Sequence, residues 1–139
     1  MVGARRRFLV VGLVIALMVA FAGQALAAKG GHGKARGGSL ELVMMDPTDG
    51  APHWGETATF EVSTTATDRP YVVLDCYQGS LVYSASAGFY SGYPWPSDRY
   101  MTLSSNTWTG GAADCTATLF YFDGRHVRDL ATMSFHAYA

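Results

Sequence analysis

Residues 57–62 read Thr-Ala-Thr-Phe-Glu-Val, and this stretch decides the fold class. Its apolar residues Ala58, Phe60 and Val62 alternate with polar neighbours, which is the two-residue period of a half-buried β-strand. The same alternation returns near the end of the chain, between Ala131 and Ala137. No segment after residue 38 carries the 3.6-residue period of an amphipathic helix. The sequence therefore predicts an all-β protein.

Turn-forming pairs divide this part of the chain into about seven expected strands. Asp-Pro, Asp-Gly, Gln-Gly and Gly-Gly pairs separate the alternating segments. Seven short antiparallel strands, each with one apolar face, are typical of a β-sandwich of about 100 residues. The expected strands cover residues 39–45, 57–65, 71–78, 81–87, 100–104, 113–122 and 129–138.

The first 27 residues are typical of a secretory signal peptide. Three arginines at positions 5–7 precede an almost unbroken apolar stretch at 8–22, and Ala-Leu-Ala at 25–27 fits a signal peptidase site. The mature protein is expected to begin near Ala28 and to act outside the cell, released or associated with the envelope. Its contact with the membrane is then only transient. An uncleaved signal anchor stays open as the alternative, because the apolar stretch is long enough to span a bilayer.

Residues 5–9, Arg-Arg-Arg-Phe-Leu, also resemble the twin-arginine export motif. The general secretory route is the preferred interpretation, because the apolar stretch is strongly hydrophobic and Ala4 stands where that motif usually has Ser or Thr. Both routes lead out of the cytoplasm.

Charge and composition divide the mature chain into a tail and one domain. Residues 28–38 contain five glycines, three basic residues and no large apolar side chain, so we expect a flexible basic tail. Residues 39–139 form a single domain by length and hold four basic and eleven acidic residues, a net charge of −7. Such a surface repels phosphate backbones, and no nucleic-acid partner is expected.

Cys76 and Cys115 are the two cysteines of the chain. An isolated pair in an exported protein usually forms a disulfide, and both lie among apolar residues of the same parity, on buried faces. The pair lacks the C-x-x-C spacing of a redox site and the four ligands of a structural metal site. The sequence therefore predicts a disulfide, with no metal and no cofactor.

Two segments resemble bacterial immunoglobulin-like domains: residues 55–62 resemble the entry into their second strand, and residues 113–117, Ala-Asp-Cys-Thr-Ala, their sixth strand. More closely, residues 62–139 resemble a group of small secreted actinobacterial proteins of unassigned function. The resemblance implies an immunoglobulin-like antiparallel β-sandwich over residues 39–139 and brings no known active site. It rests on Ser-Thr-Thr-Ala-Thr-Asp-Arg-Pro at 63–70, Gly-Tyr-Pro-Trp-Pro at 92–96 and Trp-Thr-Gly-Gly-Ala-Ala-Asp-Cys at 108–115.

The cysteine positions depart from the antibody pattern. There the disulfide joins the second and sixth strands, and a tyrosine stands two residues before the second cysteine. Here Cys76 falls on the third expected strand, and Ala113 takes the tyrosine position before Cys115. If the third and sixth strands are neighbours, the disulfide would join two strands of one sheet instead of crossing the core.

Residues 89–100 break the alternation with five aromatic residues and two prolines in twelve positions. One explanation is that the rings cap the end of the core, because aromatic side chains dominate small cores. The other is ligand binding, because rigid aromatic rings lose little entropy on binding and can stack on sugars. The candidate ligand-binding residues are Tyr90, Tyr93, Trp95, Asp98, Arg99 and Tyr100.

No catalytic constellation emerges from the sequence. The four histidines are scattered, and Ser86 lies in a stretch that lacks the first glycine of a nucleophile elbow. Asp46 and Asp49 could hold calcium only weakly, and turn formation explains both. The leading hypothesis is a non-enzymatic module that binds a protein or an envelope surface. A glycan-binding module that uses residues 89–100 is the alternative, and a small secreted hydrolase is the third.

Overall fold

The computed structural model describes residues 37–46 and 49–139. The predicted signal peptide at 1–27 and residues 28–36 of the predicted tail lie outside the described residues. Within the described ranges, no helix is long and apolar enough to cross a membrane.

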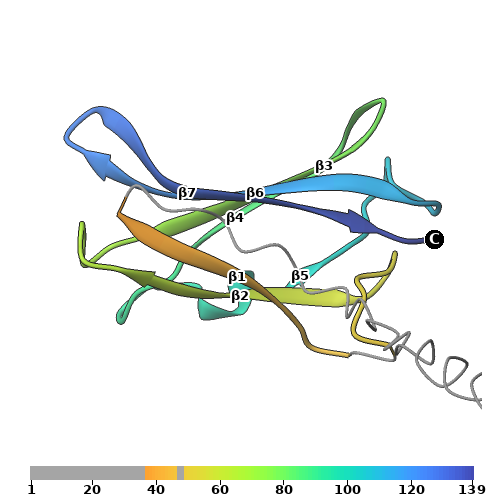
Figure 1. Ribbon diagram of the computed structural model, residues 1–139, viewed down its shortest axis with the longest axis horizontal. Coiled ribbons are helices and arrows are strands. Elements are labelled where there is room, and N and C mark those ends of the chain that lie inside the picture. Colours follow the sequence, from red (N-terminus) through yellow and green to blue (C-terminus); the bar gives the residue numbers. More distant parts are fainter. Residues whose placement is uncertain (1–36, 47–48) are drawn as a thin grey trace, which may run out of the picture.

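The described residues form seven strands in two antiparallel sheets, so the all-β prediction is confirmed for them (Figure 1). One sheet has three strands in the order β1-β2-β5, and the other has four in the order β4-β3-β6-β7. A short 3-10 helix, η1 (Pro96–Arg99), precedes β5. The strands are β1 (Gly38–Met44), β2 (Thr57–Thr64), β3 (Tyr71–Gln78), β4 (Ser80–Gly88), β5 (Met101–Thr102), β6 (Ala113–Asp123) and β7 (His126–Ala137).

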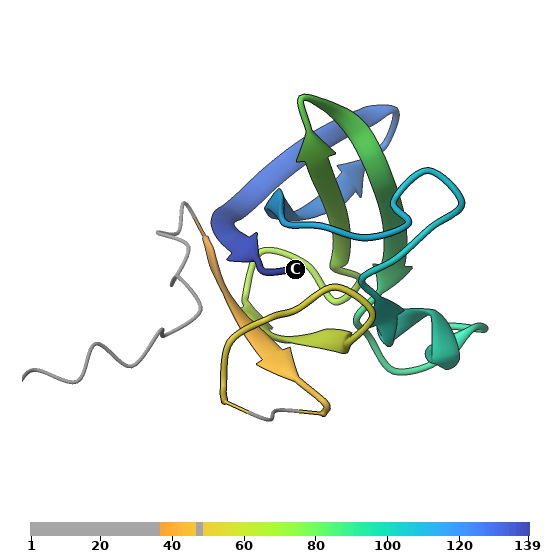
Figure 2. The ribbon, with the colours of Figure 1, turned by 90° about the vertical axis from the view of Figure 1, so that its right-hand side faces the viewer.

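The two sheets face each other, as the view from one end shows (Figure 2). The buried side chains of the two sheets form one hydrophobic core. Alternate residues of each strand point inward, because successive side chains of a strand project to opposite faces. Ala58 and Phe60 on β2 are buried as predicted, and so are Val72 and Leu74 on β3. The sequence pattern therefore assigned the inner faces of these strands correctly.

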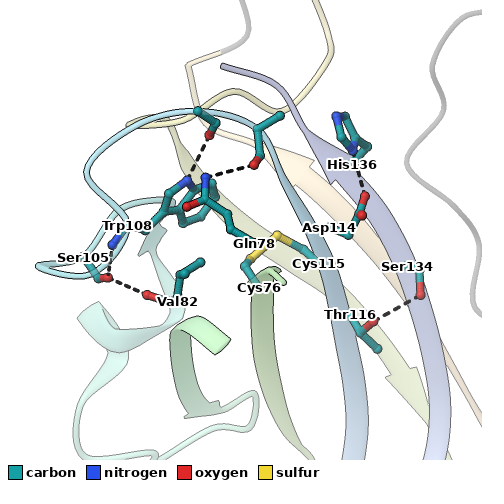
Figure 3. Close-up of a disulfide and its surroundings, with 12 residues drawn as sticks. Cys76, Gln78, Val82, Ser105, Trp108, Asp114, Cys115, Thr116, Ser134 and His136 are labelled. Atoms are coloured by element: carbon teal, nitrogen blue, oxygen red, sulfur yellow. Dashed lines mark hydrogen bonds and ion pairs between the residues drawn. A yellow bond between two sulfur atoms is a disulfide. The ribbon is translucent and has the colours of Figure 1, made fainter. Parts of the chain in front are cut away.

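Trp108 is the largest fully buried side chain, although it lies in the loop between β5 and β6. Its indole Nε1 donates to the carbonyl of Gly111 at 3.0 Å, and its backbone N–H donates to Ser105 Oγ at 2.9 Å (Figure 3). Its own carbonyl accepts from Trp54 Nε1 at 3.0 Å. These bonds allow a loop tryptophan to fill the core without leaving its polar atom unpaired.

The disulfide between Cys76 and Cys115 is confirmed (Figure 3). The two cysteines lie directly opposite each other on the neighbouring strands β3 and β6. The bond therefore joins two strands of one sheet, which is the arrangement expected if those strands are neighbours.

Of the seven expected strands, β3 has the predicted bounds; β1, β2, β4 and β6 differ from them by one residue at one or both ends, and β5 and β7 differ by more. β1 begins at Gly38, whereas β5 keeps only two residues of the expected 100–104. β5 is short because its ladder with β2 has only two residue pairs. Leu103 follows this strand and is fully buried. β7 begins at His126, three residues early, because β6 goes on pairing with β7 beyond Phe120, the residue opposite the first residue of β3.

Candidate functional site

Six aromatic side chains form a continuous surface on the outer face of the four-stranded sheet. Val72 and Leu119 are fully buried, so their neighbours Tyr71 and Phe120, which face each other across β3 and β6, point away from the core. The loop at 89–100 leaves the end of β4 and adds its own rings. We call this set the aromatic band; it consists of Tyr71, Tyr90, Tyr93, Trp95, Phe120 and Phe122.

Tyr71 joins the strand rings to the loop rings. Its ring centroid lies 5.7 Å from that of Phe120 and 5.4 Å from that of Phe122. On the loop side, Tyr71 lies 5.6 Å from Tyr90, and Tyr93 lies 5.6 Å from Tyr90. These separations fall within the range of about 4.5–7 Å that aromatic pairs prefer. Trp95 continues the row, 5.8 Å from Tyr93.

Gly88 explains why the loop rings can lie against the sheet. It ends β4 directly opposite Tyr71. A Cβ atom at this position would overlap the rings of Tyr90 and Tyr93. The missing side chain therefore leaves the space that these two tyrosines fill.

Arg99 holds the loop in this conformation. Its Nε donates to the carbonyl of Gly88 at 2.7 Å, and its Nη2 donates to the carbonyl of Tyr90 at 2.6 Å. The guanidinium carbon also lies 5.7 Å from the ring centroid of Phe89 and 5.8 Å from that of Tyr93, within cation–π range. Arg99 was predicted as a ligand contact. In the structure, its Nε and Nη2 donors bind carbonyls within the protein and position the loop at 89–100.

The remaining residues of the loop divide between core and surface. Phe89 packs on the core, with its ring edge-to-face against Phe60. Trp95 is 62% exposed and belongs to the band. Tyr100 and Asp98 are also exposed, but they are not members of the aromatic band. The capping and surface explanations thus each describe part of the loop.

The other half of the band has a signal in the sequence. Phe120 and Phe122 fall on the polar phase of β6, one residue out of step with buried Leu119. Large aromatic residues in the solvent-facing phase of a strand are typical of an interaction surface. Tyr71 carries no such signal, because its contact with the loop depends on tertiary structure.

Charges of both signs lie in the chain segments next to those that carry the band. All four arginines of residues 39–139 and four aspartates lie at 68–69, 98–99 and 123–129. Arg128 and Asp123 form an ion pair at 3.6 Å within this group. Two further aspartates lie on the strands of the band itself, Asp75 on β3 and Asp114 on β6, so the acidic excess of residues 39–139 extends to these strands.

The band itself is uncharged at neutral pH. The Tyr71 and Tyr90 hydroxyl oxygens lie 3.1 Å apart. This hydrogen bond, followed by burial, raises the pKa of Tyr71 above its ordinary value. The bond uses one of the two hydroxyl protons, so the other remains available as a hydrogen-bond donor.

A groove of about 390 Å³ lies beside the edge strand β4. Val82, the extra residue of a bulge in β4, contributes to its wall. The Val82 carbonyl accepts from Ser105 Oγ at 2.5 Å and from Thr107 Oγ1 at 2.9 Å (Figure 3). Two hydroxyls of the groove, those of Ser105 and Thr107, therefore donate within the protein.

Two aspartate–histidine pairs flank the ring of Tyr138. His53 Nε2 lies 3.0 Å from Asp49 Oδ2, and His136 Nδ1 lies 2.8 Å from Asp114 Oδ1. The hydrogen bond to Asp49, followed by that to the Ala139 carbonyl, raises the pKa of His53. A nucleophilic triad requires a histidine hydrogen-bonded to a hydroxyl or thiol. Among residues 37–46 and 49–139, neither of these two histidines makes such a bond.

Metal ligands do not gather in the described ranges. No group of three or more His, Cys, Asp or Glu side chains there could hold a metal ion. Pro47 and Thr48, within the weak calcium candidate at 46–50, lie outside the described residues.

Comparisons of the chain with protein-family models, with curated proteins and with solved structures give no match in any of the three.

Proposed function

We propose that the protein is a secreted, non-enzymatic, immunoglobulin-like module that binds a component of the cell envelope through the aromatic band. The observation that carries this proposal is the exposure of Trp95 and Phe122, at 62% and 55%, in a row of rings that the protein itself holds in place. Contiguous exposed apolar surface on a small protein is typical of an interaction site.

The strand order supports the immunoglobulin-like part of the proposal. If the strands are lettered A, B, C, C′, E, F and G in chain order, the two sheets read A-B-E and C′-C-F-G. Immunoglobulin-type sandwiches likewise place C, F and G in one sheet and A, B and E in the other. The disulfide fits an oxidising, extracellular environment.

The arrangement of the loop supports binding at a low entropic cost. Arg99 and Gly88 fix Tyr90 and Tyr93 against the sheet before any ligand arrives. A preorganised surface loses less conformational entropy on binding than a flexible one does.

Binding to isolated cell envelopes of the producing organism tests the proposal. The labelled, exported protein should sediment with the envelopes, and Trp95→Ala should reduce its binding at least tenfold. Tyr77→Ala is the matched control, because Tyr77 is a 44% exposed aromatic residue on β3, near the disulfide and away from the band. Absence of envelope binding, or equal binding by Trp95→Ala and the unmodified protein, would contradict the proposal.

A further inference from the structure

We infer that the ligand of the aromatic band is a neutral glycan chain; this inference rests on the proposed binding function. The relevant observations are the continuous ring contacts, the tyrosine hydroxyls among them and the net negative charge of residues 39–139.

The rings form an extended surface instead of a single pocket. Tyr71 is shared by two groups of mutually contacting rings, one with Tyr90 and Tyr93 and one with Phe120 and Phe122, and Trp95 extends the first group through Tyr93. An extended surface suits a chain of several sugar units better than one small molecule. One face of a pyranose ring presents weakly positive C–H bonds, which pack on the negative face of an aromatic ring.

Hydroxyl groups lie between the apolar surfaces. The Tyr71 and Tyr90 hydroxyls share one hydrogen bond, so one of their two protons remains free to donate. Within the described residues, the Tyr93 hydroxyl has no hydrogen-bond partner. A sugar supplies the matching chemistry, because its hydroxyls both donate and accept beside an apolar face.

Charge favours a neutral glycan over an anionic polymer. Residues 39–139 carry a net charge of −7, which repels phosphate-rich or uronic chains at long range. Near the band, the donors of Arg99 bind backbone carbonyls, and Arg128 is paired with Asp123. These contacts reduce the positive charge that an anionic ligand would meet at the band.

A panel of immobilised neutral oligosaccharides tests the inference: chitohexaose, cellohexaose, xylohexaose and mannohexaose, with polygalacturonate as the anionic comparison. The exported protein should bind at least one neutral member, and its affinity should change little up to about 0.5 M NaCl, because no ion pair contributes. Trp95→Ala and Phe122→Ala should each lower the affinity at least tenfold, whereas Tyr77→Ala should retain it. Circular dichroism and thermal unfolding establish that each variant is folded.

Three results would overturn the inference: no neutral member is bound, polygalacturonate is bound in a salt-sensitive way, or folded Trp95→Ala and Phe122→Ala bind as well as the unmodified protein. Envelopes treated with protease separate this failure from that of the proposed function. If the protein binds untreated envelopes but neither protease-treated ones nor any oligosaccharide of the panel, the partner is a protein and the binding function stands. If the protein binds no envelopes at all, both the glycan inference and the proposed function are contradicted.

Discussion

The hydroxyl oxygens of Tyr71 and Tyr90 lie 3.1 Å apart and join the first residue of β3 to the loop that follows β4. Nineteen positions separate these residues in the chain. Both rings are half-buried, so the bond links the fixed part of the aromatic band to the part that the loop contributes.

Tyr90→Phe removes this bond while keeping the ring. The change should cost about 0.5–1.5 kcal/mol, the net value of a typical hydrogen bond. It should also lower the pKa of Tyr71, since the bond to Tyr90 is the main cause that raises it.

The sign of the pH effect follows from that pKa. A tyrosine with a raised folded-state pKa contributes stability that is fully present below its unfolded pKa and is lost as pH rises through the folded pKa. Stability should therefore fall less steeply above about pH 10 in Tyr90→Phe. NMR titration of labelled tyrosines measures the pKa, with Tyr77→Phe as the control; an unchanged Tyr71 titration would refute the assignment.

The disulfide encloses a sequence separation of 39 residues. Replacing Cys76 and Cys115 together with alanine should lower the free energy of unfolding by about 4 kcal/mol, because the unfolded chain regains the entropy of an open loop. Urea unfolding measures the change, and the reduced, thiol-blocked natural chain provides a comparison. Equal unfolding midpoints for the variant and the oxidised protein would show that the bond adds no stability.

Trp108 should be the most sensitive single position in the core. Trp108→Ala should cost about 3–5 kcal/mol, as truncation of a buried aromatic residue usually does. Trp108→Phe also loses the bond to Gly111, but it keeps an aromatic ring in the core. It should therefore cost less than Trp108→Ala. Trp54→Phe is the control, because the Trp54 side chain is partly exposed and its indole N–H donates to the Trp108 carbonyl. Thermal unfolding that ranks Trp54→Phe as the most destabilised would contradict the packing.

Arg99→Gln should loosen the loop at 89–100 without unfolding the sheets. Hydrogen bonds to a charged group are worth about 1.5–3 kcal/mol, so chymotrypsin should cleave the loop at least about tenfold faster. Arg69→Gln is the matched control, because Arg69 is an exposed arginine near Tyr71. Equal cleavage rates for the two variants would exclude a positioning role for Arg99.

His53 should titrate above the ordinary histidine pKa of about 6.5. The hydrogen bond to Asp49 is the largest cause, so Asp49→Asn should lower the pKa of His53. Because the folded-state pKa is raised, the stabilisation is fully present below about pH 6.5 and is lost as pH rises through the folded value. NMR titration of the imidazole measures this shift; Asp46→Asn is the control, and equal pKa values in the two variants would contradict the pairing.

The sequence predicted most of the fold because burial in a sheet has the simple period of two residues. Alternation identified the inner faces of β2 and β3, and the parity of Cys76 and Cys115 anticipated their buried pairing. The length of β5 could not be predicted in this way, because its pairing partner on β2 sets where it ends.

The candidate site was predicted only in part, because it is assembled from segments distant in the chain. Clustering within 89–100 pointed to Tyr90, Tyr93 and Trp95. Their neighbours on β3 and β6 meet them only after the sheet forms. Arg99 shows the same limit: its residue type suggested a ligand contact, whereas folding brings its donors to the backbone of its own loop.

The edge strand β4 carries two backbone carbonyls that accept hydrogen bonds from side chains of neighbouring loops. Val82 accepts from Ser105 and Thr107, and Gly88 accepts from Arg99. An open strand edge is a template on which another chain can add and begin aggregation. By occupying acceptors near both ends of β4, these loops leave less of the edge for a second molecule. The contacts that shape the groove and the aromatic band thus also protect the protein against edge-to-edge self-association.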